Sequence, residues 1–257
     1  MNIGIFDSGI GGLTVVRELF NIVSGCKIIY FADVGHMPYG NKKCEDIIKY
    51  TEKIVKFLKS KDVDIIVSAC GTVSSLIPSM KENNIIGVIE PSCISASKSS
   101  KNKKIGVIAT SLAVKIGEYR RFLNSLDQKF EIFLSSCPNL ASIIENSPEN
   151  QENISNYIEL CISPIAEKNI DTLILGCTHY PLVKKVIEDK FPSLNIIDSS
   201  LETAKFIRSI INQKKTENLD KNRLLIYVSE LRKKFIENAS HIMNFDCSNI
   251  IKYQRID

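Results

Sequence analysis

The sequence contains no tryptophan and no Cys-x-x-Cys pair, and no apolar run approaches the roughly 18 residues that a membrane helix requires. Its first residues, Met1 to Asp7, reach an acidic side chain early and lack the basic start and cleavage site of a secretory signal peptide. These absences argue against a zinc or thioredoxin-like motif, a membrane anchor and a secreted disulfide framework. We therefore expect a cytoplasmic protein whose thiols stay reduced.

What is present is the composition of an ordinary soluble globular protein. The 257 residues are 44% hydrophobic and 24% charged, which is enough to bury one large or two medium cores. The net charge of +4 is a small excess that a lysine-rich surface explains, and the basic residues form no dense stripe. We therefore expect no nucleic-acid partner, and the lack of a membrane span predicts no membrane partner.

Eight cysteines need an explanation, because reduced cysteines are either small buried residues or reactive thiols. Most of them lie in or beside apolar segments, at the start of a charged helix, or at a strand end without a counterpart. We expect these to be structural: Cys26, Cys44, Cys93, Cys137, Cys161 and Cys247. The other two, Cys70 and Cys177, follow a different pattern.

Short β-branched runs alternate with longer amphipathic stretches along most of the chain. Strands are expected at residues 3–6, 27–31, 64–68, 85–89, 105–108, 130–134, 172–175 and 195–197. Helical spacing of apolar residues is found at 13–20, 45–59 and 155–168. This alternation predicts an α/β protein with parallel sheets covered by helices on both faces.

The two halves of the sequence also resemble each other. Residues 3–8 match residues 105–110 in pattern, and residues 64–70 match residues 171–177 in the same order and at nearly the same separation. Chance similarity is an alternative, since any α/β chain repeats apolar strands followed by small polar residues. We interpret the repeat as two α/β domains of similar topology.

Cys70 and Cys177 occupy equivalent places in this repeat. Each ends an apolar strand, and a threonine, Thr72 or Thr178, follows within two residues. Ligands of open α/β sheets bind beyond the carboxyl ends of the strands, where exposed helix amides favour a thiolate. If the domains face each other, one thiolate can remove a proton from a carbon while the other thiol returns one to the opposite face, which inverts a stereocentre. The alternative is a pair of small buried residues.

Further groups accompany the two thiols. His179 lies two residues after Cys177 and Asp7 follows the first strand, so each is a candidate proton-handling neighbour of one thiol. The glycines within residues 7–12 (DSGIGG) lack the GxGxxG spacing of a dinucleotide site. We interpret them as a tight turn that presents amides to an anionic group such as a carboxylate.

Four motifs together resemble the glutamate racemase family: residues 6–15 (FDSGIGGLTV), 37–40 (MPYG), 89–91 (IEP) and 175–182 (LGCTHYPL). The resemblance runs from Ile3 to Ser200 and continues more weakly through residues 226–229. It implies cofactor-independent interconversion of L- and D-glutamate, which supplies D-glutamate for peptidoglycan synthesis. It also implies two similar α/β domains with mostly parallel sheets and an active site in the cleft between them.

The resemblance implies domain boundaries and residue roles as well. One domain would comprise residues 1–94 and 207–257, and the other residues 95–206. Cys70 would act on the D-isomer and Cys177 on the L-isomer, assisted by Asp7, His179 and Glu145. The residues expected to hold the amino acid are Asp7, Ser8, Pro38, Tyr39, Gly40, Gly71, Thr72, Thr110, Thr178 and His179. No cofactor or metal is implied, and a homodimer is an expectation that the sequence leaves open.

Two positions depart from the family's usual pattern. Gly71 stands where the family usually has asparagine, and Ala32-Asp33-Val34 replaces Gly-Asp-Thr or Gly-Asp-Ser. The loss of one amide contact to the substrate costs about 0.5–1.5 kcal/mol. Two alternatives therefore stay open: a related racemase or isomerase of another amino acid such as aspartate, and a catalytically weak amino-acid-binding protein. Retention of both thiols argues against the second.

Overall fold

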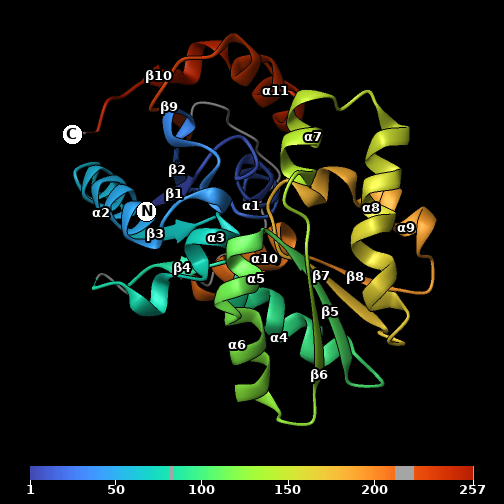
Figure 1. Ribbon diagram of the computed structural model, residues 1–257. Coiled ribbons are helices and arrows are strands. Elements are labelled where there is room, and N and C mark those ends of the chain that lie inside the picture. Colours follow the sequence, from blue (N-terminus) through green and yellow to red (C-terminus); the bar gives the residue numbers. More distant parts are fainter. Residues whose placement is uncertain (82–83, 212–222, 257) are drawn as a thin grey trace.

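Two parallel sheets form the frame of the molecule in the computed structural model, which describes residues 1–81, 84–211 and 223–256 (Figure 1). The strand order is β10-β9-β2-β1-β3-β4 in the first sheet and β6-β5-β7-β8 in the second. Every pairing in both sheets is parallel, as predicted. The strands are β1 Asn2–Asp7, β2 Lys27–Ala32, β3 Ile65–Ser68, β4 Ile86–Gly87, β5 Lys104–Ala109, β6 Glu131–Ser136, β7 Thr172–Leu175, β8 Asn195–Asp198, β9 Leu224–Val228 and β10 Ile251–Tyr253.

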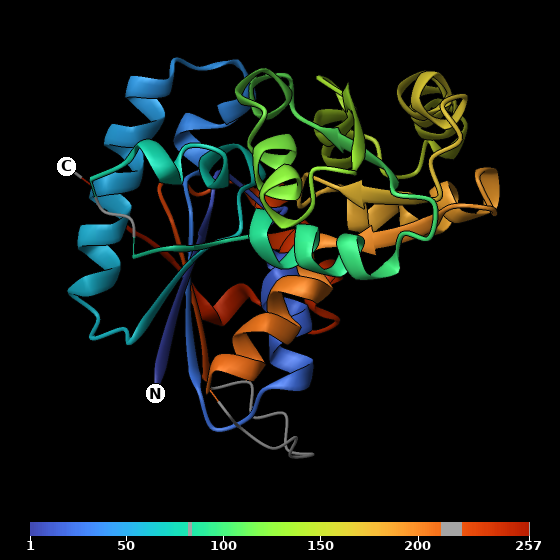
Figure 2. The same cartoon turned by 90° about the horizontal axis from the view of Figure 1, so that it is seen from below.

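Helices follow nearly every strand and cover both faces of the sheets (Figures 1 and 2). The α-helices are α1 Leu13–Ile22, α2 Cys44–Lys59, α3 Gly71–Ser74, α4 Ile89–Ser99, α5 Ser111–Ile116, α6 Glu118–Leu126, α7 Leu140–Asn146, α8 Gln151–Ala166, α9 Lys184–Lys190, α10 Ser199–Ile211 and α11 Lys233–Met243. The short 3-10 helices are η1 Val34–His36, η2 Tyr39–Asn41, η3 Ile77–Ser79, η4 Tyr180–Val183 and η6 Ser248–Ile250. In the part of the chain that the structure describes, no helix is both long and apolar enough to cross a membrane.

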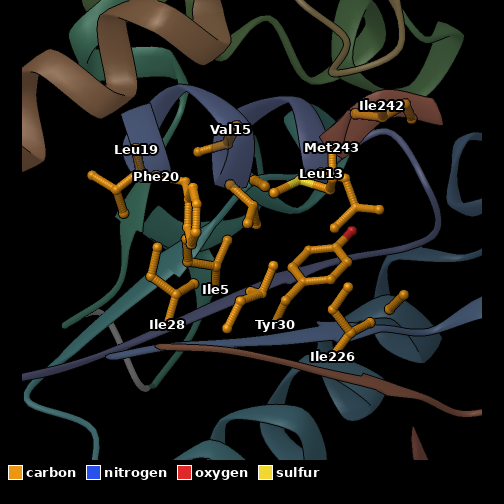
Figure 3. Packing of buried hydrophobic residues seen from close by; sticks show 14 of the residues in the cluster. Ile5, Leu13, Val15, Leu19, Phe20, Ile28, Tyr30, Ile226, Ile242 and Met243 are labelled. Carbon is orange, nitrogen blue, oxygen red and sulfur yellow. The ribbon is translucent and has the colours of Figure 1, made fainter. Parts of the chain in front are cut away.

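Successive side chains of a strand point to opposite faces of its sheet, so each sheet has one apolar core on each face. In β2, Ile28 and Tyr30 point into a core under α1, α10 and α11, whereas Ile29 and Phe31 point into a core under α2 and α3. Figure 3 shows Tyr30 in the first of these cores, among side chains of α1, β9 and α11. The second sheet is divided in the same way, with α7, α8 and α9 on one face and α4, α5 and α6 on the other. Burial on both faces explains why these strands are apolar throughout.

The internal repeat of the sequence appears as a shared strand order. The segment β2-β1-β3-β4 of the first sheet corresponds to β6-β5-β7-β8 of the second. Cys70 follows β3 and Cys177 follows β7, so the two thiols lie at equivalent strand ends.

The end of the chain completes the first sheet. Strand β9 pairs with β2, and β10 pairs with β9, which places the red C-terminal segment beside the blue N-terminal strands in Figure 1. Helix α10 packs on α1 and links the second sheet back to the first. Residues 82–83, 212–222 and 257, which belong to the first predicted domain, lie outside the described residues.

One predicted strand is largely wrong. The run 85–89 forms only the short strand Ile86–Gly87, and helix α4 begins at Ile89. The Val88 amide donates to Ser74 Oγ at 3.1 Å rather than continuing the sheet ladder. Pro91 falls in the first turn of α4, where a helix needs no backbone donor. An apolar run of this length does not distinguish a strand from the start of a buried helix.

Candidate active site

All of the site residues predicted from the sequence line one pocket between the two sheets. The pocket has a volume of about 110 Å³, several times what a single water needs, and therefore suits a small molecule. From the first sheet come Asp7, Ser8, Pro38, Tyr39, Gly40, Cys70, Gly71 and Thr72, and from the second come Thr110, Glu145, Cys177, Thr178 and His179. They follow β1, β2, β3, β5 and β7, or lie on α7, so the pocket is at the carboxyl ends of the strands.

Cys70 lies in a closed environment beside a buried carboxylate. Its Sγ is 3.8 Å from Ser8 Oγ, and it stands directly before α3. Burial raises the pKa of the Cys70 thiol well above its usual range, and the negative charge of Asp7 raises it further. Burial also raises the pKa of Asp7, although His179 and the amides of Gly12 and Ser8 act in the opposite direction. Because the pKa of Cys70 is raised so far, its thiol carries a proton at neutral pH when the pocket holds no substrate.

Cys177 lies instead beside an imidazole. His179 Nδ1 is 3.8 Å from Cys177 Sγ, and His179 Nε2 is 3.2 Å from Glu145 Oε2. Burial alone would lower the pKa of His179, but the hydrogen bonds and charges of Cys177 and Glu145 raise it to about 10. A charged imidazolium at this position stabilises a thiolate on Cys177.

Glu145 is held in place by the end of the chain. It lies on α7, and its carbonyl accepts a hydrogen bond of 3.4 Å from Asn238 Nδ2 on α11. Lys234 of the same helix donates to the carbonyl of Asn146 at 2.9 Å. The returning C-terminal segment thus holds the backbone at the end of α7, from which the Glu145 side chain reaches His179.

Hydroxyl groups join the two sheets across the pocket. Thr72 Oγ1 and Thr110 Oγ1 lie 2.9 Å apart, one from each sheet. Behind the pocket, Thr14 Oγ1 donates to the carbonyl of Thr178 at 3.0 Å and lies 2.6 Å from Ser200 Oγ. These contacts fix the distance between the two halves of the site.

One glycine of residues 7–12 presents its amide to a carboxylate of the chain itself. The Gly12 amide donates to Asp7 Oδ2 at 2.7 Å, so the anionic group that receives it is the chain's own carboxylate. A Cβ on Gly12 would lie 2.5 Å from the Asp7 Cβ, and one on Gly11 would lie 2.5 Å from His179 Nδ1. Side chains at these positions would displace both groups from the pocket.

Gly71 is also a point of close approach. A Cβ on Gly71 would overlap the carbonyl oxygen of Gly176, the residue before Cys177. That carbonyl accepts a hydrogen bond of 3.3 Å from the Tyr119 hydroxyl. The backbone of the second half therefore occupies the space where the family's usual asparagine would begin.

Five further residues line the pocket and were missed at the sequence level: Met37, Ala141, Ser142, Asn146 and Gly176. Met37 and Gly176 belong to quoted motifs, MPYG and LGCTHYPL. Ala141, Ser142 and Asn146 lie on α7 at spacings of four, three and one from Glu145, so helical spacing would have found the first two. Among the described residues, no group of three or more His, Cys, Asp or Glu side chains is arranged to hold a metal ion.

Comparisons with known proteins agree with this geometry. The Asp/Glu/Hydantoin racemase family model matches residues 3–207. A glutamate racemase from Sulfurihydrogenibium sp. (strain YO3AOP1) is 39% identical over 246 residues, which are 94% of this chain and 90% of that protein. The crystal structure of a Bacillus anthracis glutamate racemase isoform matches with a TM-score of 0.88 at 30% identity, covering 99% of this chain and 97% of that one. A Francisella tularensis glutamate racemase, solved in complex with D-glutamate, matches with a TM-score of 0.85 at 29% identity, covering 100% of this chain and 97% of that one. The chain therefore belongs to the Asp/Glu/Hydantoin racemase family and is a relative of its glutamate racemases.

Proposed function

We propose that this chain is a glutamate racemase that interconverts L- and D-glutamate by moving the Cα proton between Cys70 and Cys177, without an added cofactor. The observation that carries the proposal is that thiols from equivalent strand ends of two similar sheets line one small pocket. The family membership supports glutamate as the substrate.

The different surroundings of the thiols support a direction for each half-reaction. With L-glutamate, the Cys177 thiolate takes the Cα proton, and the electron pair stays on the substrate carbon as a planar carbanion. The Cys70 thiol then gives its proton to the opposite face, which yields D-glutamate, a thiolate on Cys70 and a thiol on Cys177. The reverse reaction begins from that second state. Asp7 assists Cys70, and His179 with Glu145 assists Cys177.

The remaining pocket residues would hold the amino acid. Among the described lining residues, His179 is the only basic side chain, so the two carboxylates of glutamate would be bound mainly by neutral donors. Backbone amides and hydroxyls supply such donors without a competing charge near the reacting carbon. We assign the binding of the amino acid to Ser8, Pro38, Tyr39, Gly40, Gly71, Thr72, Thr110 and Thr178, together with Asp7 and His179. Pro38 has no amide hydrogen, so it would supply a contact surface and no donor.

The deciding experiment follows circular dichroism of pure L- or D-glutamate incubated with the purified chain, in the presence of EDTA and without added cofactor. The signal of either enantiomer should decay to zero. L- and D-aspartate serve as the comparison substrates. Absence of racemisation of every amino acid tested would overturn the proposal, and faster decay with aspartate would reassign the substrate.

The wider expectations are part of the same proposal. The product D-glutamate would serve peptidoglycan synthesis in the cytoplasm, and the enzyme would act as a homodimer. The domain boundaries at 94/95 and 206/207 fall inside α4 and α10. Helices α4 and α10 pack against each other. This contact supports the proposal that the chain passes from one domain to the other within these two helices.

A further inference from the structure

A second cavity of about 290 Å³ lies beside the loop that carries Tyr39. It is at the carboxyl ends of β2 and β9, between α2 and the end of the chain. The side chains that matter for its chemistry are Asp33, His36, Tyr50, Lys53, Ser229 and Arg255. This cavity shares no lining residue with the active-site pocket.

Basic groups from three separate parts of the chain face this cavity. Lys53 comes from α2, Arg255 from the C-terminal segment and His36 from η1. Lys42 adds a further positive charge nearby, with its Nζ 6.0 Å from the centre of the Tyr50 ring. Ser229 Oγ accepts the Gly35 amide at 2.9 Å, and a hydroxyl that accepts one bond can still donate its own proton. A guanidinium, an ammonium and a hydroxyl are the donors that bind phosphate and carboxylate oxygens.

Asp33 connects this cavity with the active site. Its carboxylate is buried and lines the second cavity, where His36 Nδ1 lies 2.9 Å from Oδ1. Its Oδ2 accepts a 2.5 Å hydrogen bond from the Tyr39 hydroxyl, and Tyr39 lines the active-site pocket. Burial, followed by the charge of Asp33, raises the pKa of Tyr39, so the phenol keeps the proton that it donates. One carboxylate therefore forms part of the wall between the two cavities.

The loop, residues 33–43, is also held from the side of the second cavity. The His36 ring stacks on Tyr50 of α2, with ring centres 4.0 Å apart and an angle of 19° between the planes. The Gly35 amide is tied to Ser229 beyond the end of β9. A ligand that bridges α2, the loop and the C-terminal segment would hold Tyr39 in its position beside the substrate.

We infer that this cavity is a second binding site, for a small anion bearing phosphate or carboxylate groups, and that its occupancy strengthens substrate binding through Asp33 and Tyr39. The existence of the binding site is inferred from the cavity and its lining side chains and does not depend on the proposed function. The effect on substrate binding rests on the proposed glutamate racemase function.

Binding is tested by isothermal titration calorimetry of the full chain with inorganic phosphate and, separately, with citrate at constant ionic strength. The double variant K53A/R255A should bind the preferred anion at least tenfold more weakly than the wild type. The matched controls K56A, on the same helix, and K252A, in β10, should stay within twofold, because neither side chain lines the cavity. The comparison between the two anions identifies the preferred group. Absence of binding to the wild type, or equal affinity for wild type and K53A/R255A, would overturn the site.

The coupling is tested by racemisation kinetics with saturating anion. We expect the KM for glutamate to fall at least twofold with kcat unchanged in the wild type and in K56A, and to stay constant in K53A/R255A. An anion that raises KM equally in wild type and K53A/R255A would be competing in the active site, and this result or an unchanged KM would overturn the coupling. If the chain racemises nothing, the calorimetry still decides whether the site exists.

Discussion

The two halves of the active site have the same scaffold and different chemistry. Cys70 and Cys177 follow corresponding strands of two sheets with the same strand order. Cys70 is enclosed beside Asp7 and keeps its proton, whereas Cys177 has a charged imidazole 3.8 Å away. The repeated fold therefore determines where the thiols lie, and the loops beyond each strand surround them with different charged groups.

This difference suits a reaction that needs an acid and a base at the same time. A thiolate accepts a proton and a thiol donates one, so the reaction needs one of each in the same pocket. In the proposed mechanism the two thiols exchange these roles each time one enantiomer is converted into the other. Four changes would break or sharpen the comparison.

The largest effect is expected from replacing either thiol. C70S and C177S should each lower racemisation by about 10³-fold or more, because a serine hydroxyl is a far weaker base than a thiolate at neutral pH. In D₂O, C70S should still exchange the Cα proton of L-glutamate faster than that of D-glutamate, and C177S should show the opposite preference by proton NMR. C44S, at the half-buried start of α2, is the matched control and should behave as wild type. Near-normal turnover of either active-site variant would contradict the two-thiol assignment.

The next effect is expected from removing the imidazole. H179N should lower kcat/KM by about 10²-fold, because the Cys177 thiolate loses its neighbouring positive charge. The enantiomers have equal energies, so kcat/KM must fall equally in both directions, while the ratio of the two kcat values should change. H241N alters an exposed histidine of α11 and should leave that ratio constant. An unchanged kcat ratio in H179N would mean that His179 does not serve one thiol in particular.

A smaller loss is expected from adding a side chain between the halves. G71A should lower kcat/KM by about tenfold, since its Cβ would push the Gly176 carbonyl and the adjacent Cys177 away from Cys70. G71N, which restores the family's usual residue, should be worse than G71A because its side chain is longer. A gain in kcat/KM for G71N would show that the missing amide, and not the close approach, governs this position.

The smallest effect concerns stability against pH. The pKa of His179 is about 10 in the folded protein and 6.5 in the unfolded chain, so the folded state binds this proton more tightly. Its contribution to stability is complete below pH 6.5 and is lost as the pH rises through 10. The melting temperature of the wild type should therefore fall more steeply between these values than that of H179N. Parallel melting curves for the two proteins would contradict the charged imidazole.

The sequence predicts much of this arrangement because the needed signals are local. Short apolar strands followed by Asp7, Cys70, Thr110 and Cys177 identify the carboxyl edge of both sheets from a single reading of the chain. The unpredicted parts depend on contacts between distant segments. Neither the approach of Gly71 to Gly176 nor the hydrogen bond between Asn238 and Glu145 has a local signature. The end of β4 was mispredicted because a bond from Val88 to Ser74 competes with the sheet.

The pairing of β9 with β2 also bears on how the protein is made. Ile28 of β2 pairs with Leu224 of β9, the fifth strand of the first sheet in chain order. This strand can therefore join the sheet only after residue 224 has been synthesised. The strands of the second sheet, from Lys104 to Asp198, are continuous in sequence and are all synthesised earlier. Domains generally fold as units during synthesis, and pairings between distant segments form slowly. The second sheet could therefore be assembled first, and the first sheet would wait until β9 has been synthesised.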